Sequence, residues 1–168
     1  MLSEAIQTKP VLQNISIGPW QKEISDAGMK LLSEAIQNAP AFQSISIGLT
    51  PWNKVFSDAC VEHLSKAIEN APELQSISIR LSYGVFSDVG MERLSEAIKN
   101  ASALQNISLA CDEISAAGMK LLSEAIQNAP VLQNIRIGIW NIWEKDFSKA
   151  CMEYLSKAIQ NAPALQSA

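Results

Sequence analysis

The sequence predicts an α/β solenoid, a curved coil with short parallel strands on its concave face and α-helices on its convex face. One phrase, apolar at its first, fourth and sixth positions, recurs at 12–17, 42–47, 74–79, 104–109 and 132–137. Each copy is followed by a loop, a serine and a segment with helical spacing. Because one strand and one helix cannot bury their apolar faces alone, successive units must stack into a continuous core.

Each recurring phrase is expected to form a strand. Its last three positions alternate apolar, polar and apolar, so the aliphatic side chains point to one face and the polar side chains to the other. The polar face then carries Asn14, Ser16, Ser44, Ser46, Ser76, Ser78, Asn106, Ser108, Asn134 and Arg136. This set is small and nearly neutral, which argues against strongly electrostatic recognition on the concave face.

The segment after each strand is expected to be a helix that begins at a serine. The capping serines are Ser25, Ser57, Ser87, Ser115 and Ser148. A large apolar residue precedes each serine and another follows it by four positions, which is the spacing of a hydrophobic staple. The helices are expected to end at Asn38, Asn70, Asn100, Asn128 and Asn161.

The composition limits the class of protein. A chain of 168 residues that is 48% hydrophobic and 18% charged can bury a sizeable core. Its net charge of -4 and its scattered Lys and Arg residues argue against a nucleic-acid partner. No apolar run approaches the roughly 20 residues needed to cross a bilayer, and the start of the chain lacks the features of a signal peptide. We therefore expect a cytoplasmic protein without a membrane partner.

The pattern Leu-x-x-Ile-x-Ile, followed by a capped helix and Asn-Ala-Pro, resembles the ribonuclease-inhibitor type of leucine-rich repeat. Such repeats also occur in cytoplasmic NOD-like receptors and in bacterial effectors. The resemblance covers essentially all of 1–168 and implies a single leucine-rich-repeat solenoid domain of about five full repeats. It also implies a protein-protein interaction scaffold that binds its partner on the concave face, and delivery into a host cytosol if the chain comes from a bacterial effector.

Two features depart from this family pattern. Most repeats are longer than the roughly 20 to 29 residues usual for the family. The consensus Asn or Cys just after each strand, which forms the asparagine ladder of the family, is replaced by Trp20, Thr50, Ser82, Asp112 and Trp140. The strand-to-helix loops are therefore where this chain differs most from its family.

The candidate partner-binding residues lie in these loops and on the strand face. The loop aromatics are Trp20, Trp52, Tyr83, Trp140 and Trp143. Large aromatic side chains are typical of binding hot spots, although they could instead fold over the ends of the core. Arg80 and Arg136 add charge to the strand face, where each could bind a partner carboxylate or stay solvated.

Nothing in the sequence indicates catalysis. The chain has no GxSxG, GxxxxGK or HExxH motif, so we expect neither an enzyme nor a cofactor. His63 lacks a second ligand at metal spacing and is expected on the convex surface, which argues against a metal site. Cys60 and Cys151 occupy a position that is otherwise glycine and are expected to be buried thiols, whereas Cys111, just past a strand, is expected to be exposed.

The two ends of the sequence suggest a second function. The chain opens within an expected helix and closes within a sixth copy of the strand phrase, so neither end has a polar capping unit. We expect either a fragment of a longer array or a homo-oligomer, a self-assembling structural repeat that associates through its uncapped ends. Residues 27–40 and 117–130 are identical, which indicates that a block of three repeats was duplicated.

Overall fold

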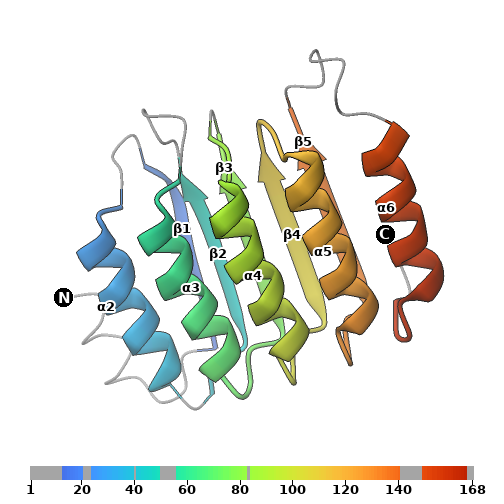
Figure 1. The fold of residues 1–168 in the computed structure, drawn as a ribbon. Coiled ribbons are helices and arrows are strands. Elements are labelled where there is room, and N and C mark those ends of the chain that lie inside the picture. Colours follow the sequence, from blue (N-terminus) through green and yellow to red (C-terminus); the bar gives the residue numbers. More distant parts are fainter. Residues whose placement is uncertain are drawn as a thin grey trace.

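The structure, a computed structural model, describes residues 13–20, 24–39, 41–49, 56–82, 84–140 and 149–165, with the side chains of 19 and 20 left out. Five parallel strands form one sheet in the order β1-β2-β3-β4-β5, and helices alternate with them along the chain (Figure 1). The strands are β1 (Asn14–Trp20), β2 (Ser44–Leu49), β3 (Ser76–Leu81), β4 (Asn106–Cys111) and β5 (Asn134–Ile139). The helices are α2 (Asp26–Gln37), α3 (Asp58–Asn70), α4 (Asp88–Asn100), α5 (Ala116–Asn128) and α6 (Lys149–Asn161). The predicted α/β solenoid is confirmed.

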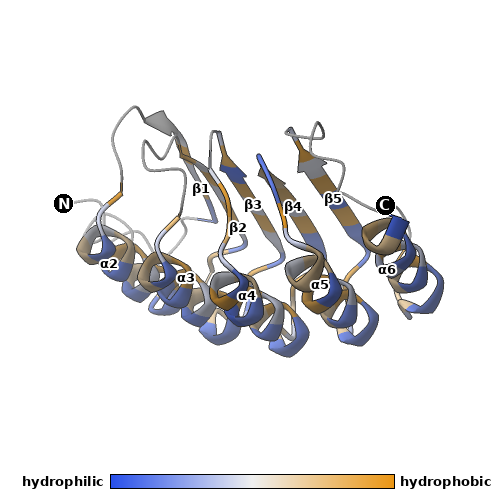
Figure 2. Cartoon of the chain, turned by 45° about the horizontal axis from the view of Figure 1, so that its top comes forward, coloured by the Kyte–Doolittle hydropathy of each residue, from blue (hydrophilic) through white to orange (hydrophobic). Residues whose placement is uncertain are grey.

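The helices form one layer and the strands the other (Figure 2). All the described helices lie on the same face of the sheet, and each helix packs against the next one along the chain. Neighbouring strands are about 4.8 Å apart, whereas packed helices need about 8 to 10 Å. A stack with one strand and one helix per repeat must therefore curve, with the sheet on its concave side.

The strands begin and end about two residues later than the recurring phrase. The phrase at 42–47, for example, gives β2 over Ser44–Leu49. The delay has a physical cause, because the backbone N–H groups of Gln43 and Ser44 both donate to the carbonyl oxygen of Gln13, at 2.8 and 2.9 Å. These two residues converge on one acceptor before the regular ladder starts. The same shared contact recurs at every later strand of the sheet.

The core lies between the two layers. In β2, Ile45, Ile47 and Leu49 are no more than 4% exposed, as the alternating pattern predicts. The first apolar residue of each described phrase is also buried, namely Phe42, Leu74, Leu104 and Leu132. Phe56 and Phe86, which precede two of the capping serines, meet edge to face with ring centroids 6.2 Å apart. The core is therefore continuous from repeat to repeat.

The helices begin where the serines predicted. Ser25, Ser57, Ser87 and Ser115 accept a hydrogen bond from the backbone N–H of the third following residue, at 2.9 to 3.2 Å. Ser148 lies outside the described residues. At the other end, the amide side chains of Asn38, Asn70 and Asn128 donate to the carbonyl oxygen four residues earlier, at 2.7 to 2.8 Å. These asparagines therefore satisfy carbonyls that the end of a helix leaves open.

The capping serines also connect the repeats, which the sequence analysis did not anticipate. The hydroxyl of Ser57 donates to Asp26 Oδ1 of the preceding helix at 2.5 Å. Ser87 bonds in the same way to Asp58, and Ser115 bonds to Asp88. We call this series the serine-aspartate ladder; it runs along the N-terminal ends of the helices. The hydrogen bond from Ser57, followed by one from Cys60, lowers the pKa of Asp26.

The expectation that Cys111 would be exposed was wrong. Its relative exposure is 0%, because β4 continues two residues past the phrase and the alternation carries Cys111 inward, opposite Ile139 of β5. Burial raises its pKa to about 12. Cys60 and Cys151 are buried as predicted, and burial raises the pKa of Cys60 to about 11.

Candidate functional site

The face of the sheet opposite the helices, which we call the open sheet face, is the strongest candidate for a binding surface. The register aligns its outward side chains into rows across the strands. The first row is Asn14, Ser44, Ser76, Asn106 and Asn134; the second is Ser16, Ser46, Ser78, Ser108 and Arg136; the third is Gly48, Arg80, Ala110 and Gly138. These rows hold short neutral side chains, two arginines and no carboxylate.

The two arginines are available to a partner. Arg80 on β3 and Arg136 on β5 are both exposed. No ion pair is recorded for either one with any part of the chain that the structure describes. They stand two strands and one row apart, so their Cα atoms are separated by about 12 Å. Two long side chains at this separation can reach toward the same ligand group.

Two small residues lie between the arginines. Gly138 pairs with Ala110, and Ala110 pairs with Arg80, so Gly138 and Ala110 form a low area that we call the Gly138 shelf. A Cβ atom placed on Gly138 would meet the Cβ of Ala110 at 3.5 Å, an ordinary contact. Packing therefore does not require a glycine there. The shelf was not predicted from the sequence, because Ala110 and Gly138 lie one residue past the end of the recurring phrase.

Trp140 borders the shelf. It follows β5 directly, its side chain is 63% exposed, and its backbone N–H donates to the carbonyl oxygen of Cys111 at 3.1 Å. The alternation of β5 places Arg136 and Gly138 on the same side of the strand, and the backbone hydrogen bond of Trp140 continues the pairing with β4 by one residue. Trp140 is therefore exposed next to the shelf, and its role in binding stays a prediction.

The structure does not show whether the side chains of the other predicted loop aromatics are exposed. Trp20 ends β1, where its backbone pairs with Leu49, and its side chain is not among those described. Trp52, Tyr83 and Trp143 lie outside the described residues. Their role in binding stays a prediction. Of the seven candidates, the structure places Arg80, Arg136 and Trp140 on one part of one face.

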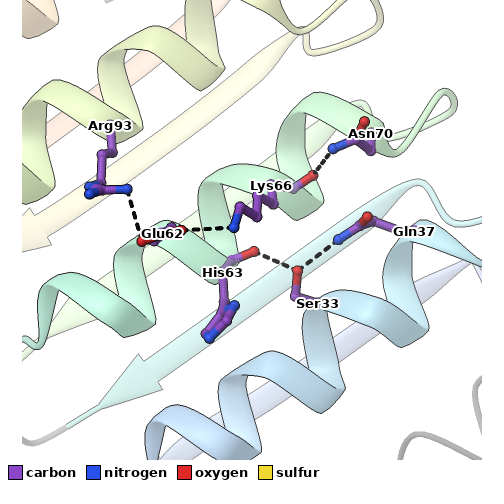
Figure 3. A network of polar contacts seen from close by, with 7 residues as sticks. All are labelled: Ser33, Gln37, Glu62, His63, Lys66, Asn70 and Arg93. Carbon is purple, nitrogen blue, oxygen red and sulfur yellow. Dashed lines mark hydrogen bonds and ion pairs between the residues drawn. The ribbon is translucent and has the colours of Figure 1, made fainter.

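The helix face differs from the open sheet face because its basic side chains are largely paired with glutamates. Figure 3 shows Glu62 of α3 between Lys66, at 2.7 Å, and Arg93 of α4, at 2.9 Å. The hydrogen bond from Lys66 and then the charge of Arg93 lower the pKa of Glu62. In the same view the Ser33 hydroxyl donates to the backbone carbonyl of His63 at 2.5 Å. These contacts tie neighbouring helices together.

His63 lies on α3 in the helix layer and is partly exposed, as predicted for the convex side. Across the described ranges, no group of three or more His, Cys, Asp and Glu side chains is arranged to hold a metal ion. Separately, none of the described helices combines the length and the apolar character that crossing a membrane requires.

A shallow groove of about 210 Å³ separates α4 and α5 on the helix face, and it is lined by Glu92, Glu96 and Glu124. Its base includes Ser95, whose buried hydroxyl has no hydrogen-bond partner in the described structure. The equivalent serines of α3 and α5, Ser65 and Ser123, share that state. An unpaired serine that recurs on three successive helices reflects the close approach of the helices, so we do not treat the groove as a site.

The sequence matches no family model and no curated protein. The fold, by contrast, is similar to solved structures. A tropomodulin C-terminal domain from Caenorhabditis elegans superposes with a TM-score of 0.65 at 16% identity, over 96% of this chain and 93% of that one. The leiomodin-1 actin-binding site 2 superposes with a TM-score of 0.66 at 9% identity, over 94% of this chain and 87% of that one. Both are leucine-rich-repeat domains, and the chain described here has the leucine-rich-repeat fold.

Proposed function

We propose that this protein is a protein-protein interaction scaffold that binds a partner through the open sheet face and the adjoining strand-to-helix loops. The observation that carries the proposal is the contrast between the two faces. The helix face pairs most of its basic side chains with glutamates, whereas the open sheet face leaves Arg80 and Arg136 unpaired within the described structure. The exposed ring of Trp140 adds the kind of side chain that dominates binding energy at interfaces. The same proposal holds that the protein is not an enzyme and that it acts in the cytosol.

A phage-displayed library of random peptides tests this function while the natural partner is still unidentified. We expect peptides enriched on the wild-type protein to bind at least about tenfold more weakly to an Arg80→Ala, Arg136→Ser double variant. These substitutions use residues that the same rows already carry at Ala110 and Ser108. Lys99→Ser, which removes a positive charge from α4, is the control. Enriched peptides that bind the double variant as tightly as the wild type would refute the proposal.

Actin is a reasonable first protein to test, because the name of the leiomodin domain states that it is an actin-binding site. The measurement is cosedimentation with actin filaments and thermophoresis with actin monomers. Binding that weakens in the double variant would support actin as a partner through the open sheet face. If neither actin filaments nor actin monomers bind, actin is rejected as a partner. The peptide library then remains the test of the general proposal.

Self-association is a second candidate, because α6 exposes apolar side chains on one side. Met152 and Ile159 are 54% and 42% exposed. We propose that a second copy of the chain covers this side, and light scattering coupled to size exclusion over a tenfold concentration range would test it. A mass above 18.3 kDa that falls in a Met152→Lys, Ile159→Lys variant is the expected result. A constant monomer mass would reject it.

A further inference from the structure

We propose that the open sheet face over β3, β4 and β5 binds an acidic segment of a partner protein, with one carboxylate held between Arg80 and Arg136 over the Gly138 shelf. This inference rests on the proposed function and names the chemistry of the partner. It depends on charge, on space and on the position of the two arginines.

The charge of the open sheet face favours a negatively charged partner segment. The chain as a whole has a net charge of -4, yet the three rows of the open sheet face carry two positive side chains and no negative one. The carboxylates of the described helices lie on the opposite layer, where several pair with lysines or Arg93. An acidic segment would therefore meet attraction on this face and repulsion on the other.

The small side chains of the Gly138 shelf leave room for the partner's carboxylate between the two arginines. Arg136 and Trp140 flank Gly138 along β5, and Arg80 lies beyond Ala110 across the strands. Every side chain on the shelf itself is a methyl group or a hydrogen atom, so a partner side chain can lie on the sheet between the two guanidinium groups. The Trp140 ring, 63% exposed, can pack on the apolar part of that side chain.

The positions of Arg80 and Arg136 allow both guanidinium groups to bind the same carboxylate. Each guanidinium offers a planar pair of N–H donors that match the two oxygens of a carboxylate. From Cα atoms about 12 Å apart, the two side chains approach the shelf from different directions. Asp112, one residue past β4, lies beyond the third row and already takes part in an interaction. It therefore borders the proposed site without lying between the two arginines.

The test uses a fluorescein-labelled peptide of ten glutamates, whose binding to the full chain is followed by fluorescence anisotropy. Arg80→Ala and Arg136→Ser are each expected to weaken binding about tenfold, and the double variant is expected to lose nearly all of it. Lys99→Ser makes the same change in net charge on the helix face, and it is expected to stay within about twofold of the wild type. Equal losses in Lys99→Ser and the arginine variants would overturn the proposal, because binding would then be general charge attraction.

The shelf has its own pair of matched variants. Gly138→Leu places a side chain where the carboxylate is proposed to lie, and a Cβ atom there makes only an ordinary contact with the Cβ of Ala110, at 3.5 Å. Gly18→Leu is the control on β1, since a Cβ there meets nothing within 4 Å. We expect Gly138→Leu to weaken binding at least about fivefold with an unchanged thermal melting temperature, and Gly18→Leu to have little effect. Unchanged binding in Gly138→Leu would place the carboxylate elsewhere and overturn the proposal.

Two further probes separate this inference from the proposed function. A peptide of ten lysines should bind the Arg80→Ala, Arg136→Ser double variant no more weakly than the wild type, and an oligothymidylate of twelve nucleotides should bind the wild type more weakly than decaglutamate. Lysine-peptide binding that weakens when the arginines are removed, or a preference for the oligonucleotide, would overturn the acidic-segment proposal. If decaglutamate fails while peptides from the random library still depend on Arg80 and Arg136, the proposed function stands and the acidic chemistry is wrong.

Discussion

Helices α4 and α6 carry the same apolar pattern and bury it differently. In α4, Met91 and Ile98 are 0% and 1% exposed. At the equivalent positions of α6, Met152 and Ile159 are 54% and 42% exposed. The residue types are the same and the helical spacing is the same, so the difference comes from what lies next to each helix.

The comparison shows that each helix has two buried sides with different partners. A Cβ atom on Gly118 of α5 would come within 3.1 Å of Met91 Cγ, so the methionine of one helix packs against the glycine position of the following helix. At that glycine position α6 carries Cys151, which is 1% exposed and faces α5. The side of α6 that faces α5 is therefore complete, whereas the Met152 side lies uncovered in the described structure. Part of the burial of a solenoid helix is therefore supplied by the next repeat.

Truncation of the buried isoleucine should have the largest effect. Ile98→Ala is expected to lower the free energy of unfolding by about 3 kcal/mol, because it removes buried methyl groups and leaves a cavity. Ile159→Ala is expected to cost less than about 1 kcal/mol, because its side chain is already partly solvated. Urea denaturation followed by circular dichroism measures both.

Equal losses in the two variants would contradict the comparison and would mean that α6 is covered in solution. The control is then protein concentration. A loss in Ile159→Ala that grows with concentration would identify a second copy of the chain as the cover, since association stabilises by mass action.

The sequence predicted the repeat architecture well, because that architecture depends on local patterns. The serines that begin the helices and the inward Ile45 and Ile47 follow from capping and from period-two alternation. Cys111 was misplaced because the strand length depends on pairing with a neighbour, and the phrase alone does not show where pairing stops. The exposure of Met152 fits the expectation of an uncapped end, but the residue itself could not be named from the pattern, because Met152 has the same spacing as the buried Met91.

The candidate site was only partly predictable. Arg80 and Arg136 stood out because charge is unusual on the strand face, and Trp140 stood out because tryptophan is rare in this sequence. The Gly138 shelf did not, because glycine and alanine attract attention only once the register places them between two arginines. The serine-aspartate ladder was also missed. Its partners are separated by about a whole repeat, and their contact follows from how the helices stack.

The cysteines give a smaller effect that depends on pH. Burial raises the pKa of Cys60 from its ordinary value of 9.0 to about 11, so the folded protein favours the neutral thiol. That contribution to stability is complete below the pKa of the unfolded thiol and is lost as the pH rises through the folded pKa. The free energy of unfolding should therefore fall between about pH 9 and pH 11. Cys60→Gly, which uses the residue found at this position in three other helices, should show a smaller fall.

The labelling rates of Cys60 and Cys151 test whether α6 can open without unfolding of the whole chain. Labelling with a disulfide reagent at pH 8 should modify Cys151 about tenfold faster than Cys60, because the described structure holds α6 from one side only and it can open alone. Equal rates would mean that α6 opens only when the whole chain unfolds.

The smallest expected effect concerns the serine-aspartate ladder, which ends at α5. Asp26, Asp58 and Asp88 receive hydrogen bonds from the serines of the following repeats, but α5 begins with Ala116. Ser148, the next serine of the sequence pattern, lies outside the described residues. Ala116→Asp is expected to raise the free energy of unfolding by about 0.5 to 1 kcal/mol, measured by urea denaturation.

Two sources could give this gain, and a double-mutant cycle separates them. A carboxylate in the first turn of α5 interacts favourably with the helix dipole whether or not Ser148 is present. The ladder bond needs the Ser148 hydroxyl. If Ala116→Asp gains as much in a Ser148→Ala background as in the wild type, the dipole alone explains it and the ladder does not extend to α6. A gain that falls by half or more in that background would show that one missing carboxylate is part of the difference between α6 and the internal helices.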